Sequence, residues 1–253
     1  MDSYVVASIV FASVFLGSLV GLSLNVLLPE HHRSPQSHDA IKLGTGMISV
    51  LASLVLGLLV ASVKSSFDTT DTQMQTFAAN LILLDQTLRD YGPESAKARE
   101  LVRDYTTQSI QDHWPQEAGR AVQMENTNAG AALDGARLQM LNLKVDDAYH
   151  RDLRSSALRM ADSVLQTRWL LIERSESSIH PVFLVILIAW ITLIFMSFGY
   201  NAPANVTVIV SFMVCAGALA ACIFVVVEMD TPFDGVITIS SHAMRDALAH
   251  MSQ

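Results

Sequence analysis

Long stretches without a charged side chain are the feature that most restricts how this 253-residue chain can fold. No Asp, Glu, Lys or Arg occurs over residues 4–28, 43–63 or 181–227. A helix that crosses the hydrocarbon core of a bilayer needs about 20 apolar residues. The third stretch has room for two such helices, and Asn201-Ala202-Pro203 supplies a turn between them. The sequence therefore predicts four membrane spans, over residues 4–28, 42–63, 181–200 and 204–228.

An even number of spans places residues 64–179 and both termini on the same side of the membrane. Every Lys and Arg lies on that side except Arg33 and Lys42. Because loops near the cytoplasmic face of a membrane are enriched in Lys and Arg, we expect segment 64–179 and both termini to be cytoplasmic. The chain then divides into four parts: spans one and two (1–63), a cytoplasmic domain (64–179), spans three and four (180–230) and a cytoplasmic tail (231–253).

The cytoplasmic segment has the periodicity of packed helices. Phe67, Met74, Leu81 and Leu88 recur every seven residues, and Thr70, Phe77, Leu84 and Tyr91 each follow three positions later. Residues 61–67 contain neither Gly nor Pro, so we expect span two to continue as one helix to Tyr91, where Gly92-Pro93 ends it. Further helices are predicted over 94–113, 116–145 and 146–178. The fold class is therefore all-α.

The sequence contains no motif that indicates catalysis. It has no phosphate-binding loop, no His-Glu-x-x-His zinc motif and no nucleophile elbow. Basic and acidic residues alternate along the middle helices, which indicates solvated faces rather than a nucleic-acid site. His31, His32, His38 and Asp39 could in principle bind a metal, but the prolines around them favour a plain surface loop. We expect no enzymatic activity, no cofactor, no metal site and no nucleic-acid partner.

Two neighbouring stripes run along span two. Small residues recur every four positions at Ser49, Ser53, Gly57 and Ala61, a pattern that allows close contact between helices in lipid. The next stripe is aliphatic and consists of Val50, Leu54 and Leu58. Both stripes can be packing surfaces. Alternatively, several copies of the helix around one axis would turn the aliphatic stripe into an apolar throat that gates ions by dewetting.

Span one has a small-residue stripe of its own, formed by Ser13, Gly17 and Gly21. Small residues at this spacing let two helices approach closely in a membrane. We expect span one to pack beside span two.

The order of elements resembles that of bestrophins, and more closely that of the bacterial and plant bestrophin-like family. This order is two spans, a helical middle segment, two further spans and a tail. Four segments carry the resemblance: LVLGLLV (54–60), KSSFD (64–68), LDQTLRDYGPE (84–94) and EMDTPF (228–233). The likeness covers most of the chain. It implies a homo-oligomeric ion channel in a bacterial inner membrane, with a pentamer favoured and a tetramer as the alternative.

The resemblance also implies roles for particular residues. Bestrophin pores are lined by the second helix, which places Val50, Leu54 and Leu58 at the throat. Bestrophin throats carry aromatic rings, whereas these side chains are aliphatic. The acid-rich calcium clasp of animal bestrophins is absent here, where the acids near span four are Glu228, Asp230 and Asp234. The resemblance therefore does not extend to calcium regulation or to anion selectivity.

The acids Glu228 and Asp230 stand at the C-terminal end of span four, where the helix dipole disfavours negative charge. We expect one of them to pair with Lys64, Arg174 or the backbone N–H groups near 232–235, so that span four is pinned to the cytoplasmic helices, with Pro232-Phe233 turning the tail aside. A direct role in ion binding or gating, and an ordinary solvated helix end, are the alternatives.

These observations favour an oligomeric ion channel with a pore lined by span two, in contact with lipid and inorganic ions. A non-conducting membrane anchor, whose cytoplasmic helices bind a partner or sense a signal, is the first alternative. A secondary transporter is the second. It is weakened because the spans carry no charged residue and show no pair of broken helices.

Overall fold

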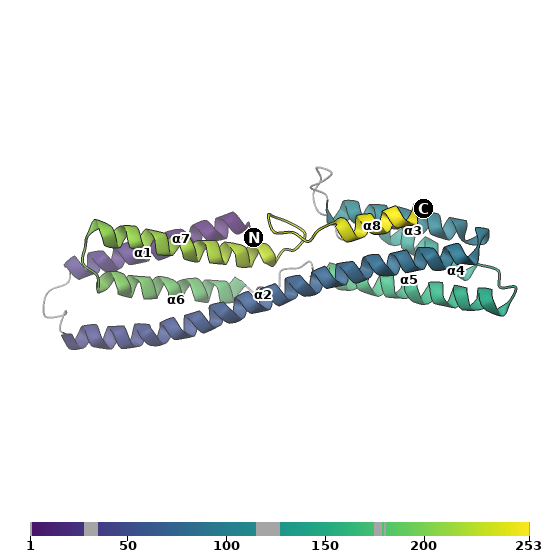
Figure 1. The fold of residues 1–253 in the computed structure, drawn as a ribbon. Helices are drawn as coiled ribbons and strands as arrows, with labels where there is room; N and C mark the ends of the chain where they lie inside the picture. Colours follow the sequence, from purple (N-terminus) through teal and green to yellow (C-terminus); the bar gives the residue numbers. More distant parts are fainter. Residues whose placement is uncertain (1, 28–34, 115–126, 175–178, 180, 253) are drawn as a thin grey trace. The chain divides into compact units, whose positions relative to one another are not determined.

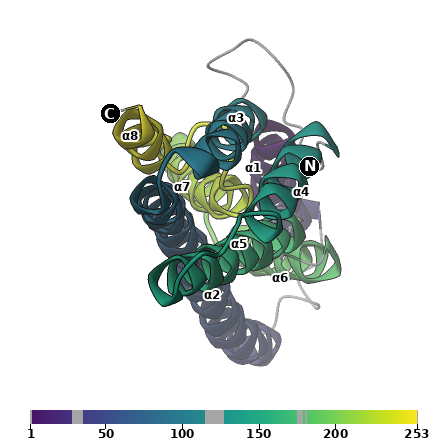
Figure 2. The ribbon, with the colours of Figure 1, turned by 90° about the vertical axis from the view of Figure 1, so that its right-hand side faces the viewer.

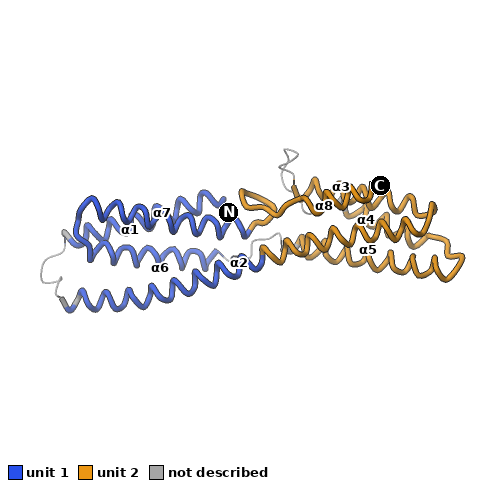
Figure 3. Tube along the Cα trace, viewed as in Figure 1, with its two compact units in different colours: residues 1–66, 177–230 blue, residues 67–176, 231–253 orange. Residues whose placement is uncertain are grey.

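The computed structural model describes residues 2–27, 35–114, 127–174, 179 and 181–252. These residues form eight α-helices and one short 3-10 helix, and no β-strand occurs among them (Figure 1). The expectation of an all-α chain with four long apolar helices is confirmed. The helices belong to two compact units (Figure 3). Unit 1 consists of residues 1–66 and 177–230, and unit 2 of residues 67–176 and 231–253.

The four apolar helices of the chain are α1 (Ser3–Leu27), α2 (Pro35–Tyr91), α6 (Pro181–Tyr200) and α7 (Val206–Met229). Three of them match the predicted spans closely, whereas α2 begins at Pro35 instead of residue 42. Proline suits the first turn of a helix because its missing N–H would have no helical partner there. The polar residues that follow Pro35 therefore extend the helix beyond the apolar stretch.

Close backbone contact joins α1 to α6 in unit 1. A Cβ atom added to Gly21 would lie 2.0 Å from the carbonyl oxygen of Met196, and one added to Gly199 would lie 2.1 Å from that of Ser18. Gly17 likewise faces Thr192. The stripe of small residues on α1 thus packs on α6, and the expectation that it faces span two is wrong. The sequence indicates that such a stripe packs against another helix, but it does not identify which helix.

Helix α2 is continuous over 57 residues. It starts in unit 1 and ends in unit 2, as the absence of Gly and Pro near residue 64 predicted. The helix stops at Tyr91 because Gly92 adopts a φ of 106°, which favours glycine over other residues. Pro93 then starts the 3-10 helix η2 (Pro93–Ser95).

Unit 2 is built on the C-terminal part of α2. Five residues of the predicted heptad pattern are buried in its core: Met74, Phe77, Leu81, Leu84 and Leu88. The remaining helices of the unit are α3 (Ala96–His113), α4 (Thr127–Leu141), α5 (Ala148–Arg174) and α8 (His242–Met251). Helix α4 packs between α3 and α5, and α8 lies beside α3 (Figure 2).

Two helices of unit 2 differ from the sequence prediction. The helix predicted over 116–145 is represented by α4, which ends at Leu141, while residues 115–126 lie outside the described part of the chain. No helix was proposed for the tail from the sequence, and α8 forms there. It buries Met244, Ala247 and Met251 on one face, at the spacing of an amphipathic helix. That spacing was present in the sequence over too few residues to be distinctive.

Candidate functional site

Within unit 1, helix α2 is buried along one edge only. Ala52 and Val63 are buried there, and Ile48, Val55 and Leu59 are partly buried against the apolar core that contains Ala52. Only 11% of the most apolar part of α2 is buried inside the chain, compared with 39% for α1. Most of the apolar surface of this helix is therefore left for contacts outside its own chain.

The predicted throat residues lie on the uncovered surface of α2. Val50, Leu54 and Leu58 are 70%, 59% and 63% exposed. At about 100° of rotation per residue, their stripe lies about 140° from the buried edge of the helix. The structure thus places the three side chains together on one exposed face, while their role as the lining of a pore remains a prediction.

The small residues form a second exposed face of α2. Ser53, Gly57 and Ala61 are exposed and Ser49 is half-buried. A Cβ atom added to Gly57 would meet no atom within 4 Å. The Ser53 hydroxyl donates a 2.8 Å hydrogen bond to the Ser49 carbonyl oxygen, so its polar atom is satisfied within the helix. This stripe leaves room for close contact with a further helix.

The two acids at the C-terminal end of α7 are buried. Glu228 is 2% exposed and Asp230 is 9% exposed. The Asp230 carboxylate accepts a 3.5 Å hydrogen bond from the backbone N–H of Ile179, just before α6 begins at Pro181. The acid at the C-terminal end of α7 therefore lies at the N-terminal end of α6, where the helix dipole favours negative charge. A pairing of Glu228 or Asp230 with the exposed Lys64 remains a prediction.

Asp234, the third acid near the C-terminal end of α7, differs from Glu228 and Asp230 because it belongs to unit 2. Its side chain is exposed and accepts a 2.9 Å hydrogen bond from the N–H of Gly235. Gly235 has a φ of 96°, which a turn of this kind requires of glycine. The structure shows Asp234 as a turn residue.

The Pro-Phe pair that follows the acids is part of the core of unit 2. The Phe233 ring lies edge-on to His113, with ring centroids 5.2 Å apart, and edge-on to Trp114 at 5.9 Å. The Trp114 indole N–H donates to the Ile239 carbonyl oxygen at 2.7 Å, and the Ile239 N–H donates to that of Pro232 at 2.9 Å. Segment 231–239 is thus held against the end of α3 instead of being turned aside.

His113 is buried beside the rings of Trp114 and Phe233. Its Nδ1 lies 2.7 Å from the Ser109 carbonyl oxygen. Burial lowers the pKa of the imidazole below its ordinary value, and the nearby positive charge of Arg168 lowers it further, while Ser109 and Asp112 act in the opposite direction. The neutral ring is therefore favoured, because the protonated form is costly in an apolar setting.

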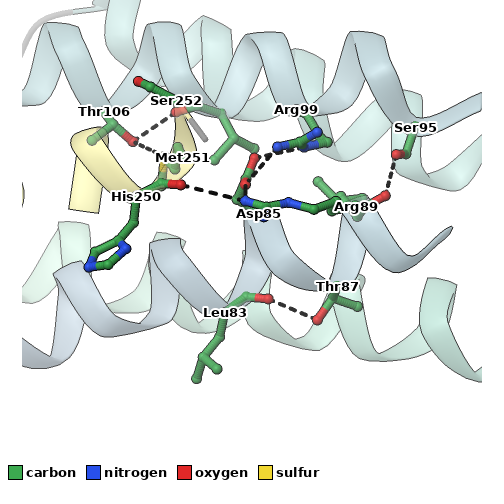
Figure 4. A network of polar contacts seen from close by, with 12 residues as sticks. Leu83, Asp85, Thr87, Arg89, Ser95, Arg99, Thr106, His250, Met251 and Ser252 are labelled. Atoms are coloured by element: carbon green, nitrogen blue, oxygen red, sulfur yellow. Dashed lines mark hydrogen bonds and ion pairs between the residues drawn. The ribbon is translucent and has the colours of Figure 1, made fainter. Parts of the chain in front are cut away.

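A buried ion pair occupies the segment LDQTLRDYGPE. The Asp85 carboxylate is 1% exposed and accepts two 2.9 Å hydrogen bonds from Arg99 of α3 (Figure 4). Arg89 adds a contact of 3.3 Å from the next turn of α2 and reaches the His250 carbonyl oxygen of α8. The segment therefore joins α2, α3 and α8. This pairing was not predicted from the sequence, although an acid next to a buried heptad position was a usable signal.

The turn after α2 is closed by two further contacts of the same segment. The Tyr91 hydroxyl donates to the Lys144 carbonyl oxygen, and the Ser95 hydroxyl donates to those of Leu88 and Gly92. The bond to Leu88 satisfies a carbonyl group that the end of α2 leaves without a helical partner. The segment thus has a structural role in unit 2.

The histidines near the start of α2 are the metal-ligand candidates of the sequence. His38 Nδ1 lies 2.8 Å from the Asn201 side-chain oxygen, and its ring stacks on Tyr200 at 5.1 Å. His31 and His32 lie outside the described residues. Over the ranges that the structure describes, no group of three His, Cys, Asp or Glu side chains is placed to hold a metal ion.

Comparison with known proteins identifies the family. The sequence model of the bestrophin-like domain matches residues 11–244, which is most of the chain and covers α2, α6, α7 and most of α1. No curated protein and no solved structure matches the chain. The chain is a multi-pass membrane protein and belongs to the bestrophin-like family.

Proposed function

We propose that the protein is an oligomeric ion channel whose pore is lined by α2, with Val50, Leu54 and Leu58 as an apolar constriction. One observation carries the proposal: the long helix of unit 1 exposes two different faces, one aliphatic and one of small residues, while only a narrow edge is buried in the chain. A helix with both faces exposed is suited to contact other copies of itself as well as lipid.

The positions of the faces around α2 support a ring of copies. At about 100° per residue, the small stripe lies about 140° from the buried edge on one side, and the aliphatic stripe about 140° from it on the other. In a ring, each inner helix turns one face to the axis and a flank to its neighbour. The small stripe suits the neighbour because it allows close approach. The aliphatic stripe then faces the axis.

An apolar ring at the axis would control the passage of ions. A constriction lined by Leu and Val side chains excludes water when it is narrow, and ions do not pass without their hydration shells. Family membership is consistent with a homo-oligomer, for which we propose a pentamer, with a tetramer as the alternative. The cytoplasmic end of the proposed pore would be lined or supported by Lys64, Glu228 and Asp230. The proposal assigns no chemical reaction to the chain.

Ion flux into liposomes tests the channel. Purified protein is reconstituted, and uptake of chloride, potassium and sodium is compared with that of empty vesicles. Leu54→Ala and Leu58→Ala should each raise the flux, because a shorter side chain widens the constriction and favours wetting. Leu193→Ala is the matched control, since Leu193 is 52% exposed but lies on α6.

The subunit number is measured in parallel from the mass of the protein in detergent. The proposal requires an oligomer, because four spans in one chain are too few to enclose a wide pore. Vesicles that contain well-assembled wild-type and variant protein but pass no ion would refute the channel and favour a membrane anchor. An equal rise in flux with Leu193→Ala would show that the α2 face has no special role.

A further inference from the structure

A pocket of about 590 Å³ lies in unit 1 at the end where α6 and α7 are joined. Its walls come from the first apolar turns of α2, the end of α6 and the start of α7. Pockets that hold small ligands in proteins have volumes of about 300–1,000 Å³. The size is therefore that of a binding site, and of its lining residues only Ser49, in the small-residue stripe, has a role in the proposed channel.

The polar side chains of the wall are largely satisfied within the protein. The Thr45 hydroxyl donates to Ser197 Oγ at 2.8 Å, and the Ser49 hydroxyl donates to the Thr45 carbonyl oxygen at 2.8 Å. The Asn201 amide donates to the Ser197 carbonyl oxygen at 2.8 Å. The wall thus presents mainly carbon to whatever fills the pocket. An occupant needs an apolar part and few hydrogen-bonding groups at this level.

Lys42 stands at one end of the pocket and supplies its positive charge. It directly precedes the apolar stretch 43–63, so its ammonium group belongs at the level of the lipid headgroups. Lys42 forms no ion pair with a carboxylate in the part of the chain that the structure describes. Ser49 of the same wall lies seven residues further along α2, which is about 10 Å deeper along the helix axis.

We propose that this pocket binds one anionic phospholipid per chain, with the phosphate beside Lys42 and an acyl chain along the carbon-lined wall. The arrangement of one cation at the headgroup level above an apolar wall matches the chemistry of such a lipid. A soluble anion would contact Lys42 alone and leave the wall uncovered. A zwitterionic lipid carries its own cation, which offsets the attraction of its phosphate to Lys42. The inference does not depend on the proposed pore.

Two substitutions separate the charge of the site from its shape. Lys42→Ala removes the cation, and Lys97→Ala is the charge-matched control in unit 2. Gly46→Leu places a branched apolar side chain inside the pocket, where a Cβ atom added to Gly46 would meet no atom within 4 Å. Gly44→Leu is its control, since Gly44 has equally open surroundings on the same helix but does not line the pocket.

Native mass spectrometry of the full chain in detergent, with added phosphatidylglycerol or phosphatidylcholine, counts the lipids retained and the subunits. The wild type and both controls should retain one phosphatidylglycerol per chain and prefer it to phosphatidylcholine. Lys42→Ala should lower that preference about fivefold, the effect of one basic residue near an anionic lipid. Gly46→Leu should lose the bound lipid.

Several outcomes would overturn the proposal. One is a wild type that retains neither lipid, and another is a Lys42→Ala variant that keeps the full preference. If Gly46→Leu lowers the subunit number but leaves the lipid count unchanged, the occupant is a second copy of the chain. Should Gly46→Leu fail to fold, Lys42→Ala still decides, because it removes an exposed side chain and leaves the pocket wall intact.

Discussion

Replacement of Asp85 tests whether the ion pair between α2 and α3 is as buried as the structure shows. Asp85→Ala leaves the Arg99 guanidinium, which is 19% exposed, without the carboxylate that accepts two of its hydrogen bonds. Breaking a buried pair on one side costs about 3–5 kcal/mol, because the remaining charge stays out of water. Since Arg99 is partly reached by solvent, we expect a loss near the lower limit, about 3 kcal/mol.

Arg89→Ala is the matched comparison. Arg89 contacts the same carboxylate at 3.3 Å but is 44% exposed and lies one helical turn away in α2. Exposed pairs of this kind contribute about 0.3–0.5 kcal/mol. Replacing both partners of the buried pair, in Asp85→Leu with Arg99→Met, should restore most of the lost stability, because no charge is then left buried.

Thermal unfolding in detergent, followed by circular dichroism, measures these differences. For a chain of this size about 1 kcal/mol corresponds to about 2–4 °C. We therefore expect Asp85→Ala to lower the midpoint by about 6–12 °C and Arg89→Ala by no more than about 2 °C. Equal, small shifts for both single variants would refute the reasoning, as would a double variant no more stable than Asp85→Ala.

Three further predictions follow from packing, titration and hydrogen bonding. Gly21→Ala should destabilise the α1–α6 contact by about 1–3 kcal/mol, measured by thermal unfolding, whereas Gly217→Ala, where an added Cβ meets no atom within 4 Å, should have little effect. The pKa of His113 is lowered on folding, so the unfolded chain binds its proton more readily. Stability should therefore fall as the pH drops below about 6.5, and His113→Phe should reduce that dependence. Trp114→Phe leaves the buried Ile239 carbonyl oxygen without its donor and should cost about 1–3 kcal/mol in denaturant unfolding.

The sequence was sufficient for those parts of the fold that depend on one helix at a time. Uncharged stretches predicted the four apolar helices because the bilayer sets a minimum length for each. The heptad pattern from Met74 to Leu88 predicted the buried face of α2 because burial follows the helical period. The lack of Gly or Pro near Lys64 predicted the continuity of the helix.

The sequence was insufficient to predict which helices pack against each other. The small stripe of α1 contacts α6 instead of α2, and both pairings are equally consistent with its spacing. The ion pair of Asp85 with Arg99 depends on the turn at Gly92, which brings α3 back along α2. For the throat residues, the sequence predicted a shared face and the structure shows that face exposed, but the neighbouring chains that would enclose a pore lie beyond one chain.

Asp230 shows why a rule for single helices has to be applied to helix pairs. Taken by itself, α7 disfavours an acid at its C-terminal end. However, α6 and α7 are joined by the short segment 201–205, so the end of α7 and the start of α6 lie at the same end of unit 1. The dipole of α6 offsets that of α7 there, and the Ile179 N–H supplies a hydrogen bond to the carboxylate. The charge is therefore placed favourably for the helix pair, although it is unfavourable for α7 alone.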